Sequence, residues 1–203
     1  MKKVGLYFGT FNPIHVGHLI IANHMADYTE LDEVWLIVTP QNPFKEKSSL
    51  LADYHRLALV RNALEDNPKV KPSDIEFNLP KPSYTIHTLL ALEEKYPETE
   101  FALIMGEDNL RTLHKWKGYE QILNDHQIYV YPRPLTIQEK EDLKEHRTPS
   151  KLANHPRVVQ VDAPVMKLSS SFIRKAIKEG HNVRYLLTDP VHKYISEMHF
   201  YKP

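Results

Sequence analysis

The chain of 203 residues contains no cysteine. Disulfide bonds, thiolate nucleophiles and cysteine-based zinc sites are therefore excluded. The chain also lacks any apolar run that approaches the roughly 18 residues needed to span a bilayer. Its first residues lead directly into a predicted strand, with no signal peptide. We therefore expect a cytoplasmic protein with no membrane partner.

Neither sign of charge is in excess, because 26 Lys and Arg residues balance 26 Asp and Glu residues. This balance argues against bulk electrostatic binding, so we expect no nucleic-acid partner, although a local basic pocket stays open. The hydrophobic content of 41% and the charged content of 26% are ordinary for a globular protein. We predict a single domain over residues 1–203, with a variable polar insertion at about residues 136–156.

The most informative stretch is GTFNPIHVGH at residues 9–18. An apolar run precedes it and a helical pattern follows it, so the stretch is predicted to form a turn that opens a helix. A helix N-terminus carries unpaired N–H groups and a partial positive charge, which suit an anion. His15 and His18 would project to one side of the first turn. There an imidazole can donate to a phosphoryl oxygen, or carry charge when a phosphate raises its pKa.

Gly17 would keep the space between these two rings open to a ligand. The alternative is that they are ordinary histidines near a cap, since the chain has 12 histidines and a lone His-x-x-His pair is weak evidence. The position directly after a strand and a Gly/Pro turn favours the anion site.

Further apolar runs predict an α/β fold. Its mainly parallel sheet would have five or six strands, with helices on both faces. The runs lie at residues 3–8, 32–39, 100–105, 127–131 and 157–161. Polar and apolar residues alternate over 73–79, which predicts a half-buried edge strand. A helical pattern covers 53–64, with Asp53 as an acidic cap.

Polar residues follow several predicted strands at the carboxyl edge, where open α/β sheets bind ligands. Lys45 would reach a phosphate from this edge, although position alone slightly favours a solvated lysine. Asp108 would either accept hydrogen bonds from ribose hydroxyls or organise a helix start. Trp116 has polar neighbours, which favour a partly exposed indole able to stack on a pyridine ring over a core position.

Two more predicted helix starts carry groups that suit anions. Ser83, Tyr84 or Thr85 would cap one helix, and its amides could receive a carboxylate, although a plain capping sequence is the simpler interpretation. Serines 169–171 are first interpreted as an N-cap. Arg174 nevertheless places a guanidinium on the same turn, in reach of phosphate oxygens.

The dipeptide His55-Arg56 lies in the first turn of the helix predicted at 53–64. Its pattern alone indicates a surface dipeptide.

The stretch GTFNPIHVGH resembles the signature of the nucleotidyltransferases with a His-x-Gly-His motif, and most of all that of the nicotinate-nucleotide adenylyltransferases. SSSFIR at 169–174 is similar to a second motif of that family, and His55-Arg56 is similar to a pair found in it. The resemblance covers nearly the whole chain except about 136–156. Phe8, Asn12 and Phe44 depart from it, since the family commonly has Gly, Asp and His there.

The resemblance implies a Rossmann-like nucleotidyltransferase fold and adenylyl transfer from ATP to nicotinate mononucleotide. The products would be deamido-NAD and pyrophosphate, in NAD biosynthesis. No covalent intermediate is expected, because the chain has no cysteine and no evident Ser/His/Asp set. Mg²⁺ would accompany ATP, held mostly by phosphate oxygens and water rather than by a protein metal site.

The resemblance also implies roles for individual residues. The catalytic residues would be His15, His18, Lys45 and Arg174. The ATP-binding residues would be Gly9, Thr10, Phe11, Gly17, Gly106, Asp108, Ser170 and Ser171. The mononucleotide would contact Asn12, Ser83, Tyr84, Thr85, Trp116 and Arg133.

Other functions stay open at this point. The acceptor could be nicotinamide mononucleotide or phosphopantetheine, the latter disfavoured by chain length and by Trp116. A nucleotide-binding regulator without catalysis is suggested by the three departures, but His15, His18, Lys45 and Arg174 argue against it. The sequence also leaves the oligomeric state open, and a homo-oligomer is compatible with it.

Overall fold

The computed structural model describes residues 1–40, 50–65, 67–133 and 151–202. Lys45, Phe44 and much of the predicted insertion lie outside the described residues. The single-domain organisation stays a prediction.

The centre of the fold is a six-stranded sheet in the order β3-β2-β1-β4-β5-β6. Every neighbouring pair is parallel, which confirms the predicted sheet. The chain starts in the middle of the sheet and leaves it in both directions, so the strand order reverses between β1 and β4. Ligands of such sheets bind outside the carboxyl ends of the strands at this point. The strands are β1 (Lys2–Gly9), β2 (Glu33–Val38), β3 (Val70–Ser73), β4 (Thr99–Gly106), β5 (Ile128–Tyr131) and β6 (Val158–Gln160).

Helices cover both faces of the sheet because successive strand residues point to opposite sides. In β4, Leu103 and Met105 pack into the core on one face, whereas Ala102 and Ile104 pack into the core on the other. The core that contains Leu103 is closed by α3 (Thr85–Lys95), α4 (Glu107–Thr112) and α5 (Tyr119–Asp125). The opposite core is closed by α1 (Val16–Tyr28), α2 (Asp53–Leu64), α7 (Ser170–Lys178) and α8 (Asp189–Glu197).

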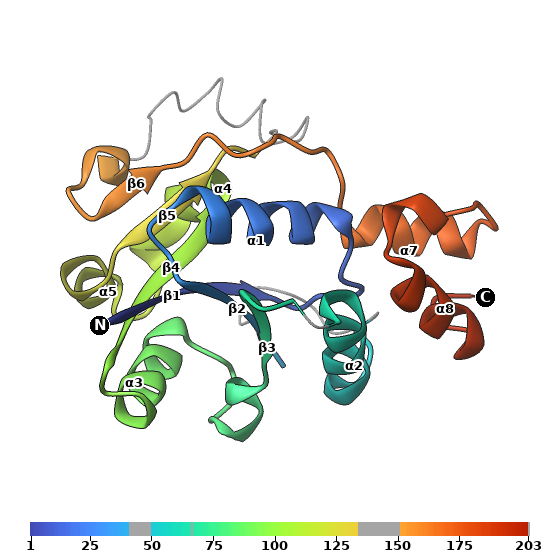
Figure 1. Ribbon diagram of the computed structural model, residues 1–203, viewed down its shortest axis with the longest axis horizontal. Coiled ribbons are helices and arrows are strands. Elements are labelled where there is room, and N and C mark those ends of the chain that lie inside the picture. Colours follow the sequence, from blue (N-terminus) through green and yellow to red (C-terminus); the bar gives the residue numbers. More distant parts are fainter. Residues whose placement is uncertain (41–49, 66, 134–150, 203) are drawn as a thin grey trace.

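The last two helices lie beyond the carboxyl end of β1. Figure 1 shows α7 and α8 at the right, next to the start of α1 and to α2. The chain therefore returns its final residues to the edge of the sheet at which the histidine motif emerges. Short 3-10 helices complete the described fold: η1 (Ile75–Asn78), η2 (Leu113–Lys115), η3 (Lys151–Asn154) and η4 (Arg184–Leu186).

The strand predicted over residues 73–79 is wrong. The edge strand β3 ends at Ser73, and η1 follows it. Glu76 is buried, and its Oε1 accepts a 2.6 Å hydrogen bond from Thr88 Oγ1 of α3. Because of this contact the chain forms η1 against α3 and does not continue as a strand beside β2. Alternating polarity does not report such a contact.

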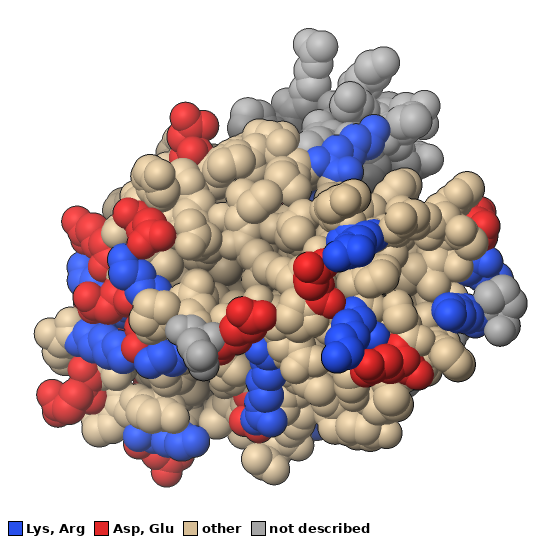
Figure 2. All heavy atoms as spheres, turned by 45° about the vertical axis from the view of Figure 1, so that its right-hand side comes forward, with Lys and Arg blue, Asp and Glu red and all other residues tan. Residues whose placement is uncertain are grey.

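Charges on the surface are mixed in sign. Figure 2 shows Lys and Arg interspersed with Asp and Glu over the face drawn there. Ion pairs occur among the charged residues of the described chain, such as Lys69 with Asp27 at 2.7 Å. In the part of the chain that the structure describes, we find no helix with the length and apolar character needed to cross a membrane.

Candidate active site

A cavity of about 560 Å³ opens at the carboxyl ends of β1 and β4. Its size is within the usual range for small-molecule sites. The turn after β1, the start of α1, the beginning of α4 and the start of α7 contribute to its wall. Predicted site residues that line it are Gly9, Thr10, Phe11, Asn12, His15, Gly17, His18, Asp108, Trp116, Arg133, Ser170, Ser171 and Arg174.

The two motif histidines lie face to face at the N-terminus of α1. Their ring centroids are 3.7 Å apart with an interplanar angle of 22°. His15 is the N-cap residue in extended conformation, and its backbone N–H donates to Nδ1 of His18 at 3.3 Å. Because Nδ1 of His18 accepts, the neutral tautomer of this ring carries its proton on Nε2.

Burial determines the charge of His15. Its side chain is 4% exposed, and this burial lowers its pKa to about 4. His15 is therefore neutral near pH 7 in the unliganded protein, rather than charged. A neutral imidazole still offers one N–H donor to a phosphoryl oxygen.

Gly17 makes room for this arrangement. A Cβ atom at position 17 would lie 3.0 Å from Nδ1 of His15 and 3.1 Å from its Cε1. The glycine thus accommodates the His15 ring itself, which adds a structural reason to the predicted access for a ligand.

Phe11 supports His18 from within the core. Its ring is 1% exposed and meets the His18 ring edge-on, with centroids 5.1 Å apart. A Cβ atom at Gly9 would lie 2.8 Å from Cζ of Phe11. Phe11 has a left-handed φ of 45°, an uncommon conformation for a residue of this size. Its predicted contact with ATP stays a prediction.

Asn12 connects the turn to distant parts of the chain. Its Oδ1 accepts hydrogen bonds from the N–H of Leu51 at 3.3 Å and from the hydroxyl of Tyr201 at 2.8 Å. Arg174 Nη1 donates to the backbone oxygen of Asn12 at 2.8 Å. The side chain predicted to contact the mononucleotide is thus also part of the scaffold of the turn.

The start of α7 docks onto this turn. Ser169 is the N-cap, as predicted, and its Oγ accepts from the N–H of Phe172 at 3.2 Å. The hydroxyl of Ser170 donates to the backbone oxygen of Pro13 at 2.8 Å, and Arg174 Nη2 donates to Oγ of Ser171 at 3.2 Å. The hydroxyls, the guanidinium and the first amides of α7 therefore face the same cavity as the histidines.

Asp108 and Arg133 form an ion pair at the far side of the cavity. The N-cap of α4 is Gly106, so Asp108 does not cap that helix. A Cβ atom at Gly106 would lie 2.5 Å from Oδ1 of Asp108, so only glycine leaves space for the folded-back carboxylate. This Oδ1 is buried and has no hydrogen-bond partner among the described residues. An acceptor without a partner beside a cavity suits a ligand hydroxyl.

The segment Ser83–Thr85 leads into α3. Its residues do not line the cavity in the described part of the chain. Tyr84 is the N-cap of α3, which confirms a predicted helix start, and Lys117 Nζ lies 4.9 Å from its ring centroid. Trp116, next to Lys117, is half-buried and lines the cavity, which confirms the predicted partly exposed ring. Trp116 therefore lines the cavity, and the residue after it contacts the ring at the start of α3.

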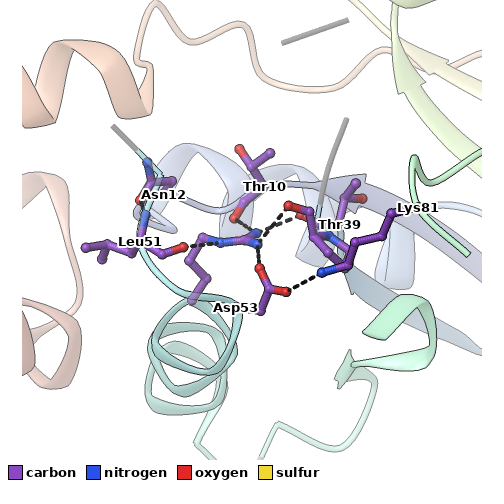
Figure 3. A network of polar contacts seen from close by, with 8 residues as sticks. Thr10, Asn12, Thr39, Leu51, Asp53 and Lys81 are labelled. Atoms are coloured by element: carbon purple, nitrogen blue, oxygen red, sulfur yellow. Dashed lines mark hydrogen bonds and ion pairs between the residues drawn. The ribbon is translucent and has the colours of Figure 1, made fainter. Parts of the chain in front are cut away.

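Arg56 is a residue whose local sequence pattern, apart from the family resemblance, does not indicate its position. The surface position indicated by its pattern is wrong, because Arg56 is 0% exposed. Asp53 is not the N-cap of α2 either; Ala52 is, and an Asp53 oxygen lies 2.6 Å from Nη2 of Arg56. The spacing of three residues between an acid and a base was the available signal. Figure 3 shows the carbonyl groups that surround the guanidinium.

Within the described residues, no group of three His, Cys, Asp or Glu side chains is placed to hold a metal ion. Asp108 is the one carboxylate among the described residues that line the cavity, and one of its oxygens pairs with Arg133. A divalent cation would accordingly depend on oxygens brought by the ligand.

Known proteins resemble this chain over nearly its full length. Residues 6–176 match the family described as cytidylyltransferase-like. A Flavobacterium johnsoniae protein named "Probable nicotinate-nucleotide adenylyltransferase" is 58% identical over 98% of this chain and 99% of its own length. A protein of the same name from Christiangramia forsetii is 54% identical over 99% of both chains.

Among solved structures, the Plasmodium falciparum nicotinic acid mononucleotide adenylyltransferase complexed with NaAD has a TM-score of 0.77. It covers 99% of this chain and 98% of its own at 17% identity. At that identity the likeness shows the fold, which is the Rossmann-like fold expected from the sequence.

Proposed function

The chain belongs to the nicotinate-nucleotide adenylyltransferase family, and we propose that its cavity holds ATP and nicotinate mononucleotide for direct adenylyl transfer. The enzyme transfers the adenylyl group of ATP to nicotinate mononucleotide, giving deamido-NAD and pyrophosphate, a step of NAD biosynthesis. An oxygen of the mononucleotide phosphate forms a bond to the α-phosphorus of ATP, and the bond from that phosphorus to the bridging oxygen of pyrophosphate breaks.

The reaction brings two anions together, so positioning and charge stabilisation are the main tasks of the protein. The attacking phosphate is already ionised and needs no strong base. Holding both reactants in line can lower the barrier by on the order of 7–11 kcal/mol. Preorganised donors in a water-poor cavity add to this effect.

The observation that carries the proposal is the stacked pair of His15 and His18 at the N-terminus of α1. In our proposal both rings donate to oxygens of the α-phosphoryl group as negative charge develops there. Because His15 is neutral near pH 7 in the unliganded protein, we propose that it meets the substrate as a hydrogen-bond donor. The α1 amides and helix dipole add positive potential at the same place.

Arg174, Ser170 and Ser171 are proposed to hold the β and γ phosphates. Support comes from the docking of α7 on the turn at Pro13 and Asn12, and from the position of all three residues in the cavity wall. Gly9, Thr10, Phe11, Gly17, Gly106 and Asp108 would complete the ATP site. Lys45 is proposed to assist from the segment outside the described residues.

Mg²⁺ is proposed as the divalent cation that accompanies ATP. Bound there, it would neutralise charge on the departing pyrophosphate. Phosphate oxygens and water would hold it, since Asp108, the one carboxylate of the described cavity wall, is paired with Arg133.

The mononucleotide is proposed to lie on the other half of the cavity, with its pyridine ring on Trp116. The amides at the start of α3, near Ser83, Tyr84 and Thr85, would receive its carboxylate. Asn12 and Arg133 would contact its phosphate and ribose side. Support for this placement is that Trp116 lines the cavity and that Nζ of its neighbour Lys117 lies 4.9 Å from the centroid of the Tyr84 ring.

The proposed setting is the cytoplasm, with small-molecule substrates and with no nucleic-acid or membrane partner. Sedimentation of the purified protein would establish whether it is a homo-oligomer.

The direct test is release of pyrophosphate from ATP and Mg²⁺ with nicotinate mononucleotide or nicotinamide mononucleotide. A strong preference for the acid is expected, since the α3 amides suit a carboxylate. Preference for the amide would move the substrate assignment but keep the chemistry. ATP binding without pyrophosphate release from either acceptor would favour a regulator of the same fold.

A further inference from the structure

The guanidinium of Arg56 is buried and fully used. All five of its N–H donors have acceptors: Nε donates to Leu51 O at 3.0 Å, Nη1 to Thr10 O at 2.7 Å and Thr39 O at 2.8 Å, and Nη2 to Pro40 O at 3.4 Å and Asp53 Oδ1 at 2.6 Å. Four of these acceptors are backbone oxygens. One side chain therefore holds three separate segments of backbone (Figure 3).

These segments surround the cavity. Thr10 belongs to the turn that carries the histidines, and Thr39 and Pro40 follow β2, the neighbour of β1 in the sheet. Leu51 precedes α2 and also donates to Asn12. Arg56 thus links the segments that follow two adjacent strands, in addition to the backbone hydrogen bond from Thr39 N–H to Gly9 O at 2.9 Å, at the edge where the substrates are proposed to bind.

Packing alone does not explain a charge in this place. Burial lowers the pKa of the Arg56 guanidinium, and the carboxylate of Asp53 opposes that shift. An apolar side chain of similar volume often stabilises a core as well as a buried ion pair does. What an apolar side chain cannot do is orient four carbonyl groups, so geometry is the property that Arg56 supplies.

Asp53 extends the network to the segment that precedes α3. Its Oδ2 lies 3.2 Å from Nζ of Lys81, and Lys81 leads through Pro82 into Ser83 and the start of α3. Figure 3 shows Asp53 between the guanidinium and Lys81. One carboxylate therefore contacts both the residue that holds the histidine turn and the segment that precedes α3.

We propose that Arg56, Asp53 and Lys81 form a positioning relay that holds the histidine turn and the start of α3 in one relative arrangement. The relay places the donors for ATP and the amides for the mononucleotide at a fixed separation. This inference rests on the proposed function, in which the two substrates occupy these two places. None of the three residues is required to touch a substrate.

The test is amide hydrogen exchange of the full unliganded chain, which does not depend on activity. Arg56→Lys keeps the positive charge but loses the five-donor fork. Faster exchange is expected in residues 9–15 and also in residues 83–88, which Arg56 does not contact. Exchange that rises at 9–15 and stays unchanged at 83–88 would overturn the relay.

If Arg56→Lys fails to fold, two variants that leave Arg56 in place still test the proposal. Asp53→Asn retains an oxygen for Arg56 but removes the ion pair with Lys81, and Lys81→Met removes only that ion pair. Both should speed exchange at 83–88, and Lys81→Arg should restore it. No effect from either variant would contradict the proposal. The matched control is Arg61→Lys on the same helix, whose ion pair with Asp74 at 3.7 Å is exposed, and which should change neither segment.

Kinetics then separates the relay from the function. Lys81→Met should raise the KM for nicotinate mononucleotide up to about fivefold, as expected for loss of a half-exposed ion pair, and leave the KM for ATP unchanged. Arg56→Lys should lower kcat by at least about tenfold, because it displaces the histidine turn. If the wild-type protein shows no adenylyl transfer but the variants show the predicted changes in hydrogen exchange, the proposed function is overturned and the relay is retained.

Discussion

The hydroxyl of Tyr201 donates a 2.8 Å hydrogen bond to Oδ1 of Asn12, a residue 189 positions earlier in the chain. Burial raises the pKa of Tyr201, so the hydroxyl keeps its proton and remains a donor. The same Asn12 oxygen accepts from the N–H of Leu51. Tyr201, which follows α8, therefore helps to hold the turn that precedes the histidines.

Removal of the Tyr201 hydroxyl should weaken this support. We expect Tyr201→Phe to lower the free energy of unfolding by about 1 kcal/mol and kcat/KM by up to about tenfold, because Oδ1 of Asn12 loses the hydrogen bond from the Tyr201 hydroxyl. Urea denaturation and steady-state pyrophosphate release measure the two effects. The control is Tyr194→Phe, which removes a hydroxyl 2.9 Å from Nδ1 of His55, away from the turn. Equal losses of activity in both variants would mean that Tyr201 acts only on global stability.

His18 should be essential for turnover. We expect His18→Ala to lower kcat by about 10²–10³-fold, the usual effect of losing one preorganised donor to developing charge. His24→Ala is the control on the same helix, since His24 stacks on Tyr28 with centroids 4.6 Å apart, away from the cavity. Thermal unfolding checks that both variants fold. More than a tenth of wild-type kcat in His18→Ala would remove His18 from the proposed chemistry.

Gly17 should tolerate no side chain. A Cβ atom there would lie 3.0 Å from Nδ1 of His15, so Gly17→Ala is expected to displace the ring and to lower kcat by about 10²-fold. Gly180→Ala is the control, because nothing lies within 4 Å of its Cβ position. With a φ of 77°, Gly180→Ala should cost about 1 kcal/mol of stability but keep full activity. Wild-type kcat in Gly17→Ala would show that the His15 ring moves without consequence.

The pH dependence of stability should report on buried His15. Its pKa is about 4 in the folded protein and about 6.5 in the unfolded chain, so the unfolded state binds more protons between these values. The free energy of unfolding should therefore decrease as the pH falls below about 6.5. Above that value His15 is neutral in both states and contributes no pH dependence.

Comparison with His15→Phe isolates this contribution. Between pH 7 and pH 5, the wild type should lose about 2 kcal/mol more stability than the variant, measured by urea denaturation at each pH. The variant keeps a buried ring but cannot titrate. Parallel losses in the two proteins would contradict the neutral, buried state of His15.

Much of the sheet could be predicted because parallel strands covered on both faces need apolar residues at nearly every position. The runs at 3–8, 32–39 and 100–105 meet that requirement, and each is a strand. The segment at 73–79 does not, and its alternation is equally compatible with η1. Its conformation depends on the burial of Glu76 against Thr88, a contact between separate elements.

In the candidate active site, too, some features follow from the local sequence and others only from tertiary contacts. A spacing of three residues at a helix start is a local property, so the sequence predicts that His15 and His18 share one side of a turn. It also predicts the cap by Ser169. Their stacking, the low pKa of His15 and the burial of Arg56 follow from which segments surround them, and no local pattern contains that information.

The sequence by itself determined the strand–turn–helix that presents the histidines, the parallel sheet and the family, because these depend on local periodicity and on a contiguous motif. Only the tertiary structure decided how that motif is held. Arg56 donates hydrogen bonds to carbonyl oxygens of three segments. Tyr201 donates to Asn12, and Asp108 forms an ion pair with Arg133. Buried polar groups must find partners, and those partners come from parts of the chain that only folding brings together.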